Sequence, residues 1–199
     1  IDGAAELRPA GDLWGLSVPE TDDALQEIAD QAVTMAAIGP AGENLVRYAA
    51  IMNNKHRAAG RCGLGAVMGA KRLKAVACAG GQPSDLAESK TFHQKARRQY
   101  DLLDESILKV GFEAFGTNMV SDMVNVRGGY PTNNWQFGEF EEIDAVGAQG
   151  LTDSVLVEGV SCFACPVACG RSTEIREGKW KGRRGEGPEY ESTNSLGAK

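Results

Sequence analysis

Three cysteines lie within eight residues near the end of the chain, and this cluster restricts the fold more than any other feature. The stretch is Cys162-Phe-Ala-Cys165-Pro-Val-Ala-Cys169, a C-x2-C-x3-C pattern. Thiolates at this spacing, on a turn that leads into the start of a helix, can converge on one metal centre, and soft sulfur donors select zinc, copper(I) or iron–sulfur. The pattern predicts a metal-binding loop. The alternative is that the three cysteines are small buried hydrophobes.

The residues around the cluster narrow the choice of metal. Zinc would be expected to take a second C-x2-C or a paired histidine motif, but His56 and His93 stand alone in the sequence. A [4Fe–4S] cluster takes four thiolates, and no fourth cysteine lies close to the three. Cys62 and Cys78 are the remaining candidates within the chain. The spacing therefore favours an iron–sulfur cluster whose fourth ligand is not assigned.

Charge and composition exclude several classes of protein. The 199 residues carry 21 basic and 27 acidic side chains, a net charge of −6, which argues against nucleic acid because phosphate binding needs clustered Lys and Arg. No apolar run approaches the roughly 20 residues that cross a bilayer, and Ile1 to Pro9 lack the features of a signal peptide. Clustered cysteines without such a signal favour a reducing, cytoplasmic setting. Because no methionine begins the chain, we expect a processed or excised piece.

Hydrophobic periodicity predicts strands and one helix in the first part of the chain. A helix capped by Thr21 or Asp22 is expected to end before Gly39-Pro40. Buried strands are expected over residues 45–52 and 73–78, with a glycine-rich connection between them.

The pattern becomes helical after a change of composition over residues 79–84, which we interpret as a domain boundary. A long helix is predicted over 86–110, followed by a second helix capped by Thr117-Asn118. An aromatic loop over 127–142 and a short helix near Thr152 complete the prediction. The chain is thus expected to be α+β, with a mixed β-containing part over 1–82 and a mainly helical part over 83–199.

The glycine-rich segment from Arg57 to Lys71 matches neither the GxxxxGK[ST] phosphate loop nor a dinucleotide fingerprint. Glycines nevertheless let backbone N–H groups approach an anion closely, and Arg57 and Arg61 could form bidentate contacts with a phosphate. The alternative is a tight structural turn with two surface arginines. The residues alone leave both interpretations open.

Four motifs occur in an order that resembles the aldehyde ferredoxin oxidoreductase family. They are IGPAGEN at 38–44, RAAGRCGLGAVMGAKRLKA at 57–75, CFACPVACGR at 162–171 and GPEYES at 187–192. The resemblance covers nearly the whole chain and identifies it as an internal fragment of a member. It implies an enzyme that oxidises aldehydes to carboxylates with a tungsten or molybdenum bis-pterin and a [4Fe–4S] cluster, although the fragment alone is expected to be inactive.

The resemblance also implies roles for particular residues. Arg57, Ala58, Gly60 and Arg61 match a stretch that contacts a pterin and its phosphate. Cys162, Cys165 and Cys169 match three cluster ligands, and Glu191 matches a carboxylate that transfers protons near the metal. Residues 1–82 would then end the pterin-binding domain, and residues 83–199 would begin the helical iron–sulfur and active-site domain. Cys62 stands where the family commonly has Gly or Ser.

Partners follow from the same resemblance: ferredoxin or another redox subunit, a small aldehyde substrate, the rest of the same polypeptide, and a second copy of the chain in a homo-oligomer. Neither nucleic acid nor a membrane is expected. The shared motifs bind cofactor rather than substrate, so a relative with other redox chemistry, such as reduction of an aromatic acyl-CoA, stays open. A non-catalytic iron–sulfur or metal-binding electron-transfer module is the third possibility.

Overall fold

The computed structural model describes residues 5–29, 32–81 and 85–199. The chain divides into two compact units, Ile1–Asp85 and Leu86–Lys199. The composition change noted above falls partly on residues 82–84, which lie outside the described residues. No helix in the described ranges is long and apolar enough to cross a membrane.

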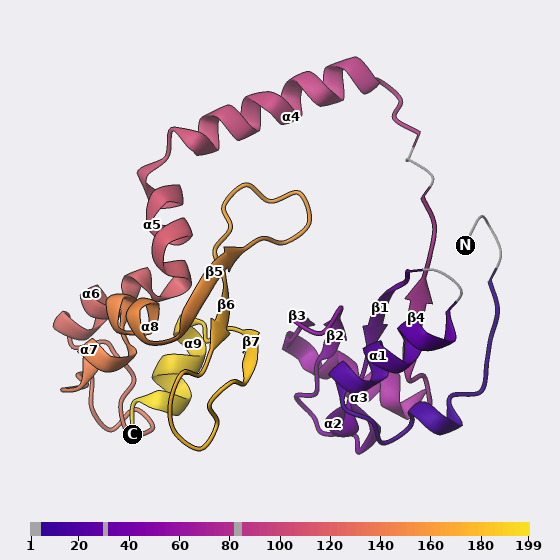
Figure 1. Ribbon diagram of the computed structural model, residues 1–199, viewed down its shortest axis with the longest axis horizontal. Helices are drawn as coiled ribbons and strands as arrows, with labels where there is room; N and C mark the ends of the chain where they lie inside the picture. The colour runs from indigo at the N-terminus through magenta and orange to yellow at the C-terminus, as the bar shows by residue number, and fades with distance from the viewer. Residues whose placement is uncertain (1–4, 30–31, 82–84) are drawn as a thin grey trace. The chain divides into compact units, whose positions relative to one another are not determined.

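The first unit is built on an antiparallel sheet with strand order β3-β2-β1-β4. Helices α1 and α3 lie against this sheet (Figure 1). Its core is formed by buried apolar side chains from β1 and from the segments that follow it: Met35, Ala37, Ile38, Ala49 and Met68. The described elements of the unit are η1 (Gly11–Leu13), α1 (Val18–Ile28), β1 (Thr34–Ala37), α2 (Pro40–Glu43), β2 (Ile51–Asn53), β3 (Arg57–Ala59), η2 (Arg61–Gly63), α3 (Leu64–Ala70) and β4 (Ala75–Cys78).

Helix α1 begins earlier than the sequence pattern predicted. Ser17 caps it, because the Glu20 carboxylate accepts hydrogen bonds from the Ser17 backbone N–H at 2.8 Å and from its hydroxyl at 2.6 Å. Thr21 and Asp22 are buried inside the helix instead of capping it. The expected end at Gly39-Pro40 was also wrong: the helix ends at Ile28, strand β1 follows, and Pro40 opens the short helix α2.

The two strands predicted in this unit were only partly correct. Residues 45–50 form turns, with Leu45 at φ 58° and Tyr48 83% exposed, and strand β2 begins only at Ile51. Strand β4 does form within residues 73–78, but it lies at the sheet edge and Val76 is half exposed. The apolar composition of residues 45–52 and 73–78 predicts buried strands. The turns at 45–50 and the edge position of β4 leave side chains of both segments exposed instead.

The second unit combines helices with an antiparallel sheet of order β5-β6-β7. Its core contains the buried Tyr130, Phe140 and Ala198, with Val124 and Tyr190 packed against them. The described elements are α4 (Ser89–Asp104), α5 (Ile107–Phe115), η3 (Gly116–Val120), α6 (Ser121–Val126), α7 (Ile143–Val146), α8 (Ala148–Val155), β5 (Leu156–Val160), β6 (Gly170–Glu174), β7 (Arg184–Glu186), α9 (Tyr190–Ser192) and the π-helical turn η4 (Thr193–Gly197).

The α+β class is confirmed, and the second unit contains a sheet that the periodicity did not indicate. The long helix expected over 86–110 is broken at Glu105 and Ser106, where Ser106 precedes α5 in an extended conformation. The aromatic loop over 127–142 contains one isolated bridge, Thr132 to Phe137, and a helix covers Thr152 as expected.

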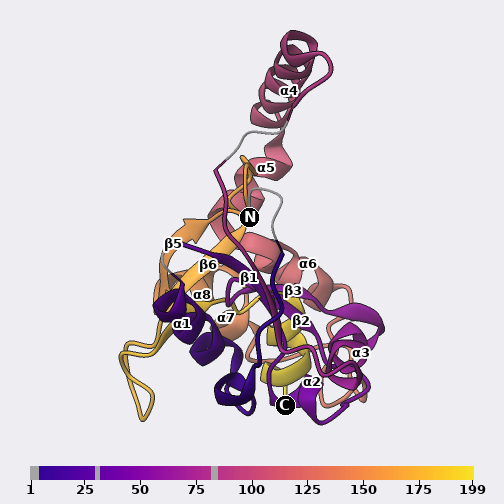
Figure 2. The same cartoon turned by 90° about the vertical axis from the view of Figure 1, so that its right-hand side faces the viewer.

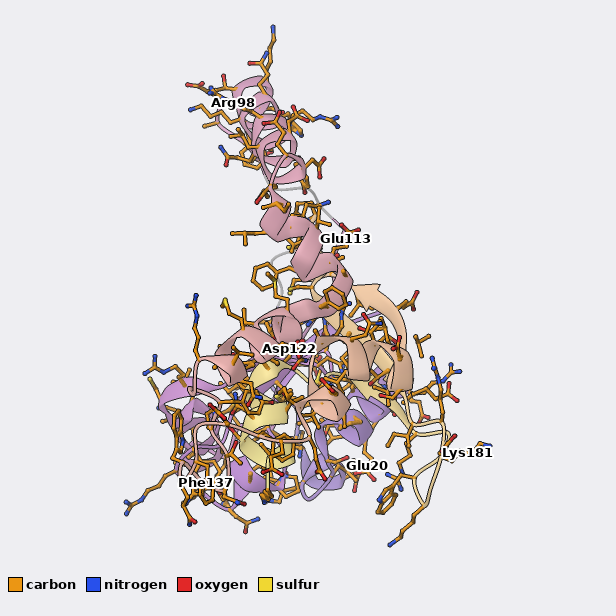
Figure 3. All side chains as sticks on the ribbon, turned by 90° about the vertical axis from the view of Figure 1, so that its left-hand side faces the viewer. Glu20, Arg98, Glu113, Asp122, Phe137 and Lys181 are labelled. Atoms are coloured by element: carbon orange, nitrogen blue, oxygen red, sulfur yellow. The ribbon has the colours of Figure 1, made fainter. Side chains whose placement is uncertain are left out.

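Helix α4 extends away from the remainder of its unit (Figures 1 and 2), and no described residue of it is buried. Arg98 lies far out on this helix, whereas Glu113 on α5 and Asp122 on α6 lie progressively nearer the core (Figure 3). Phe92 is 54% exposed although it belongs to the apolar stripe of the helix. The connection between β5 and β6 extends toward α4 (Figure 1).

Candidate metal centre

The three clustered cysteines occupy the loop that joins strands β5 and β6. The last and first residues of these strands, Val160 and Gly170, are paired, so the loop leaves and re-enters the sheet at one point. Cys162 is exposed, whereas Cys165 and Cys169 are half-buried, and all three are free thiols. The expectation that the turn leads into a helix was wrong, because the chain continues from Cys169 directly into β6.

The loop backbone is folded tightly around the second and third cysteines. The Cys165 N–H donates to the Cys162 carbonyl at 3.0 Å. Ala164 and Ala168, which immediately precede Cys165 and Cys169, have left-handed φ values of 54° and 51°. A non-glycine residue in this region costs about 1–2 kcal/mol, so the surrounding structure must hold the two alanines there.

Two side chains from outside the loop hold these alanines in place. The Tyr100 hydroxyl on α4 donates to the Ala164 carbonyl at 2.7 Å, and the Arg171 guanidinium on β6 donates to the Ala168 carbonyl at 2.9 Å. Each strained position therefore has its carbonyl bound by a side chain. The backbone positions of Cys165 and Cys169 are fixed as a consequence.

The thiols affect one another electrostatically. Burial raises the pKa of the Cys169 thiol above its usual value, and the charges of Glu189, Cys165 and Cys162 raise the same pKa further. The shift favours the protonated thiol while no cation is present, and a bound metal reverses that preference because its ligands must be thiolates.

Three thiols are soft donors of the kind that an iron–sulfur cluster takes. Among residues 5–29, 32–81 and 85–199, no three His, Cys, Asp or Glu side chains are grouped closely enough to hold one metal ion. A [4Fe–4S] cluster binds each cysteine through a different iron, so its ligands surround it and do not meet at one point. Three soft thiolates on a folded loop match that requirement. Cys62 and Cys78 belong to the other unit and are exposed.

Glu189, which the sequence did not single out, is a half-buried carboxylate whose charge acts on the third cysteine of this loop. It accepts a hydrogen bond of 2.5 Å from the Thr117 hydroxyl, and its charge acts on Cys169. Glu191, which the family resemblance favoured, lies on α9 and is exposed. Both glutamates belong to the GPEYE motif, which is the sequence signal that could have drawn attention to Glu189. The two differ in burial: Glu189 is half-buried and Glu191 is exposed.

In the first unit, the predicted pterin-contacting residues form the edge strand β3 and the turn after it. Arg57 and Ala58 lie in β3, which pairs only with β2 in the described sheet. Gly60 and Arg61 follow and are exposed. A Cβ added at Gly60 would meet no atom within 4 Å, so the backbone at Gly60 is open to an approaching group.

The other glycines of this segment have a packing role. A Cβ at Gly63, Gly65 or Gly69 would overlap a backbone carbonyl of the 42–50 segment. These glycines let helix α3 lie directly against that segment, which explains most of the glycine content. Gly63, Gly65 and Gly69 therefore fit the structural interpretation of the glycine-rich segment. Among its glycines, only Gly60 has a backbone that an anion could approach.

The hairpin loop presents three thiols, and side chains bind the carbonyls of its two left-handed alanines, so it is the candidate metal-binding loop of the chain. Comparison with known proteins identifies the family. Residues 1–80 match the family described as aldehyde ferredoxin oxidoreductase, N-terminal domain, and residues 93–199 match aldehyde ferredoxin oxidoreductase, domains 2 & 3. The chain belongs to the aldehyde ferredoxin oxidoreductase family.

Individual relatives give the same result. The tungsten-containing aldehyde ferredoxin oxidoreductases of Pyrococcus abyssi and Thermococcus kodakarensis are 42% and 41% identical over 99% of this chain. An aliphatic sulfonate oxidoreductase, WOR-like subunit, of Pyrococcus furiosus is 31% identical over 96% of the chain. The chain spans only about a third of the length of these relatives: 32%, 32% and 33%.

A solved structure is also similar in fold. It is the active site complex BamBC of benzoyl coenzyme A reductase in complex with 1,5-dienoyl-CoA, with a TM-score of 0.61 and 26% identity. The match covers 85% of this chain and 28% of that one.

Proposed function

We propose that this chain is part of a tungsten or molybdenum bis-pterin oxidoreductase that oxidises aldehydes to carboxylic acids. Cys162, Cys165 and Cys169 would supply three ligands of a [4Fe–4S] cluster, through which electrons pass to ferredoxin or another redox subunit. The observation that carries the proposal is the cysteine loop, whose two left-handed alanines are held by Tyr100 and Arg171. The tungsten-containing relatives, at 42% and 41% identity, support tungsten as the pterin-bound metal.

When bound, the metal–pterin group would supply two-electron chemistry and the cluster one-electron transfer. The chain itself would position these groups. Arg57 and Arg61 would donate bidentate hydrogen bonds to the pterin phosphate, next to Ala58 and the open backbone at Gly60. The cysteine loop would hold the cluster, and half-buried Glu189 would keep a negative charge near it.

Glu191 is the proposed proton acceptor. It is exposed on α9, beside Tyr190, which packs against the aromatic core of the second unit. A general base works best when its pKa lies near the working pH, and burial raises a carboxyl pKa. The proposal therefore requires the rest of the polypeptide to cover Glu191.

A second candidate activity has a specific observation in its favour. The similarity to the benzoyl coenzyme A reductase complex, at 26% identity and a TM-score of 0.61, supports reduction of an aromatic acyl-CoA. The identity to the tungsten-containing aldehyde oxidoreductases is higher and covers more of the chain. We therefore favour aldehyde oxidation. A cytoplasmic location and assembly with a second copy of the chain stay predictions.

Assays of the whole protein separate these activities. Protein produced anaerobically with tungstate, and in parallel with molybdate, would be analysed for metal, iron and sulfide. It would then be tested for aldehyde oxidation with ferredoxin and for benzoyl-CoA reduction. Tungsten or molybdenum with aldehyde-dependent reduction of ferredoxin is the expected result. Benzoyl-CoA reduction alone would favour the second candidate. Iron and sulfide without tungsten, molybdenum or turnover would indicate a non-catalytic electron-transfer module.

A further inference from the structure

Arg171 is a buried arginine at the base of the cysteine loop. It is 5% exposed and lies on β6, two residues after Cys169. Its guanidinium donates four hydrogen bonds, all to backbone carbonyls: Gly170 at 3.0 Å, Ala114 at 2.8 Å, Glu113 at 2.8 Å and Ala168 at 2.9 Å. Its hydrogen-bonding capacity is nearly filled, but the acceptors are neutral groups.

No carboxylate of the described residues forms an ion pair with Arg171. Within the same ranges, the buried Lys74 is paired with Glu43, and the exposed Arg184 is paired with Glu174. A buried charge is ordinarily paired or bound to a metal site because desolvation is expensive. The Glu113 and Ala114 carbonyls belong to the last turn of α5, whose C-terminal end carries a partial negative charge. That partial charge compensates only part of a full positive charge.

The packing around Arg171 places its charge against the cysteine loop. Gly116, at φ 61°, ends α5, and a Cβ there would meet the Cys169 carbonyl at 2.8 Å and the Arg171 side chain at 3.3 Å. A Cβ at Gly159 would meet the guanidinium at 2.9 Å and the Ala168 carbonyl at 3.2 Å. Two glycines therefore leave the space in which Arg171, the end of α5 and the third cysteine come together.

We propose that Arg171 is a positioning residue for the cluster and also its countercharge. The inference rests on the proposed function, because the anion it assigns to Arg171 is the iron–sulfur cluster with its thiolate ligands. Through the Ala168 carbonyl the guanidinium fixes the backbone next to Cys169. Its positive charge stabilises the reduced, more negative cluster, since cluster potentials respond to nearby charge and hydrogen bonds. Removing the charge should therefore make the reduction potential more negative.

Arg176 offers a matched control in the same unit. Its guanidinium donates to the carbonyls of Asp153 and Leu156, at 2.8 Å each, at the end of helix α8. Arg176 thus makes the same kind of contact as Arg171, but it is exposed and lies beyond the far end of β6 from the cysteine loop. Replacing it removes similar hydrogen bonds without removing a buried charge beside Cys169.

The test is a reductive titration of the whole protein followed by low-temperature EPR, with iron and sulfide measured on each sample. Wild type would be compared with Arg171→Gln, Arg171→Lys and Arg176→Gln. We expect a full cluster in Arg171→Gln at a more negative potential, whereas Arg171→Lys and Arg176→Gln stay close to wild type. An unchanged potential in Arg171→Gln overturns the countercharge role while leaving the proposed function intact.

Two further outcomes are decisive if the neutral variant is unstable. Arg171→Ala, whose smaller side chain admits water to the four carbonyls, then serves as a second neutral variant. Loss of the cluster from both neutral variants with retention in Arg171→Lys supports the need for positive charge at this position. Loss from Arg171→Lys as well overturns the countercharge role and supports the positioning role alone, since the hydrogen-bonding fork and not the charge is then required. Absence of a cluster from wild type overturns both this inference and the proposed function.

Discussion

Tyr100 and Ala164, which are 64 positions apart in the chain, are joined by a hydrogen bond of 2.7 Å from the phenol hydroxyl to the carbonyl oxygen. The bond connects the otherwise exposed helix α4 to the cysteine loop and helps to hold Ala164 in its left-handed conformation. The helix therefore has a structural role at the candidate metal centre although none of its described residues is buried.

Tyr100→Phe should loosen the cysteine loop without unfolding the protein. The substitution removes one hydrogen bond of about 0.5–1.5 kcal/mol and leaves the ring in place. Iron transfer from the whole protein to a chelator should become several-fold faster. Tyr48→Phe is the control, because Tyr48 is 83% exposed on the other unit. Equal rates of iron loss in wild type and Tyr100→Phe would contradict this role.

The glycine-rich segment should show two different responses to alanine. Gly69→Ala places a Cβ against the Gly42 carbonyl and should lower the free energy of unfolding by about 1–3 kcal/mol. Gly60→Ala meets no atom within 4 Å and keeps a helical φ of −84°, so its stability should change by less than about 0.5 kcal/mol. Calorimetry of the two variants measures both effects.

The same Gly60→Ala variant tests the proposed contact with the pterin. If the backbone at Gly60 approaches the pterin closely, pterin and tungsten content should fall while the melting temperature stays near that of wild type. Full loading of Gly60→Ala would remove Gly60 from the site.

The buried pair of Lys74 and Glu43 should contribute strongly to the stability of the first unit. The Lys74 ammonium, which is fully buried, donates to Glu43 at 2.5 Å and to the Leu16 carbonyl at 2.8 Å. Lys74→Met leaves the Glu43 carboxylate buried and unpaired, which should cost about 3–5 kcal/mol. Arg97→Met is the control: Arg97 and its partner Asp101 are 81% and 56% exposed, so the loss should stay within about 1 kcal/mol. Similar melting temperatures for the two variants would be inconsistent with this difference in burial.

Glu191→Gln should reduce turnover of the whole enzyme by about two orders of magnitude or more, the share that general acid–base catalysis supplies. Cofactor content should not change, because the substitution preserves the shape of the side chain. Glu189→Gln is the informative comparison, since Glu189 is half-buried and bound to Thr117. Turnover within a few-fold of wild type for Glu191→Gln, with a large loss for Glu189→Gln, would assign the proton transfer to Glu189.

The ordered motifs in the sequence predicted the family, which the comparisons confirm. The cysteine spacing predicts a metal-binding loop, because ligand spacing is a local property, and this stays a prediction. The sheet that carries the loop and the contacts that hold it could not be predicted from the sequence. Strands β5 to β7 are three to five residues long, and each contains a glycine and at least one charged residue, so they carry too little periodicity to predict. The contacts of Arg171 and Tyr100 join residues 57 and 64 positions apart, and only tertiary structure could reveal them.

In the first unit, the strand predicted over residues 45–52 was wrong for residues 45–50, because the backbone of that segment packs against helix α3. Residues 45–50 have the apolar composition of a strand, but they form turns whose carbonyls receive helix α3 through Gly63 and Gly65. Helix α1 begins earlier than its apolar periodicity predicts because Ser17 and Glu20 form a capping box ahead of the apolar positions. Where backbone packs on backbone, glycine is the only trace of the contact in the sequence. Glycines of this same segment are also what an anion-binding turn would use, so the sequence alone did not separate the two.

Iron and acid-labile sulfide in the anaerobically purified whole protein test the central claim most directly. Wild type would be compared with Cys165→Ser and with the exposed-cysteine controls Cys62→Ser and Cys78→Ser. We expect about four irons and four sulfides per [4Fe–4S] cluster in wild type and in both controls, with a marked loss of both in Cys165→Ser. Unchanged iron and sulfide in Cys165→Ser would contradict the assignment of the cysteine loop as the cluster site. A comparable loss in Cys62→Ser or Cys78→Ser would instead identify that cysteine as the fourth ligand.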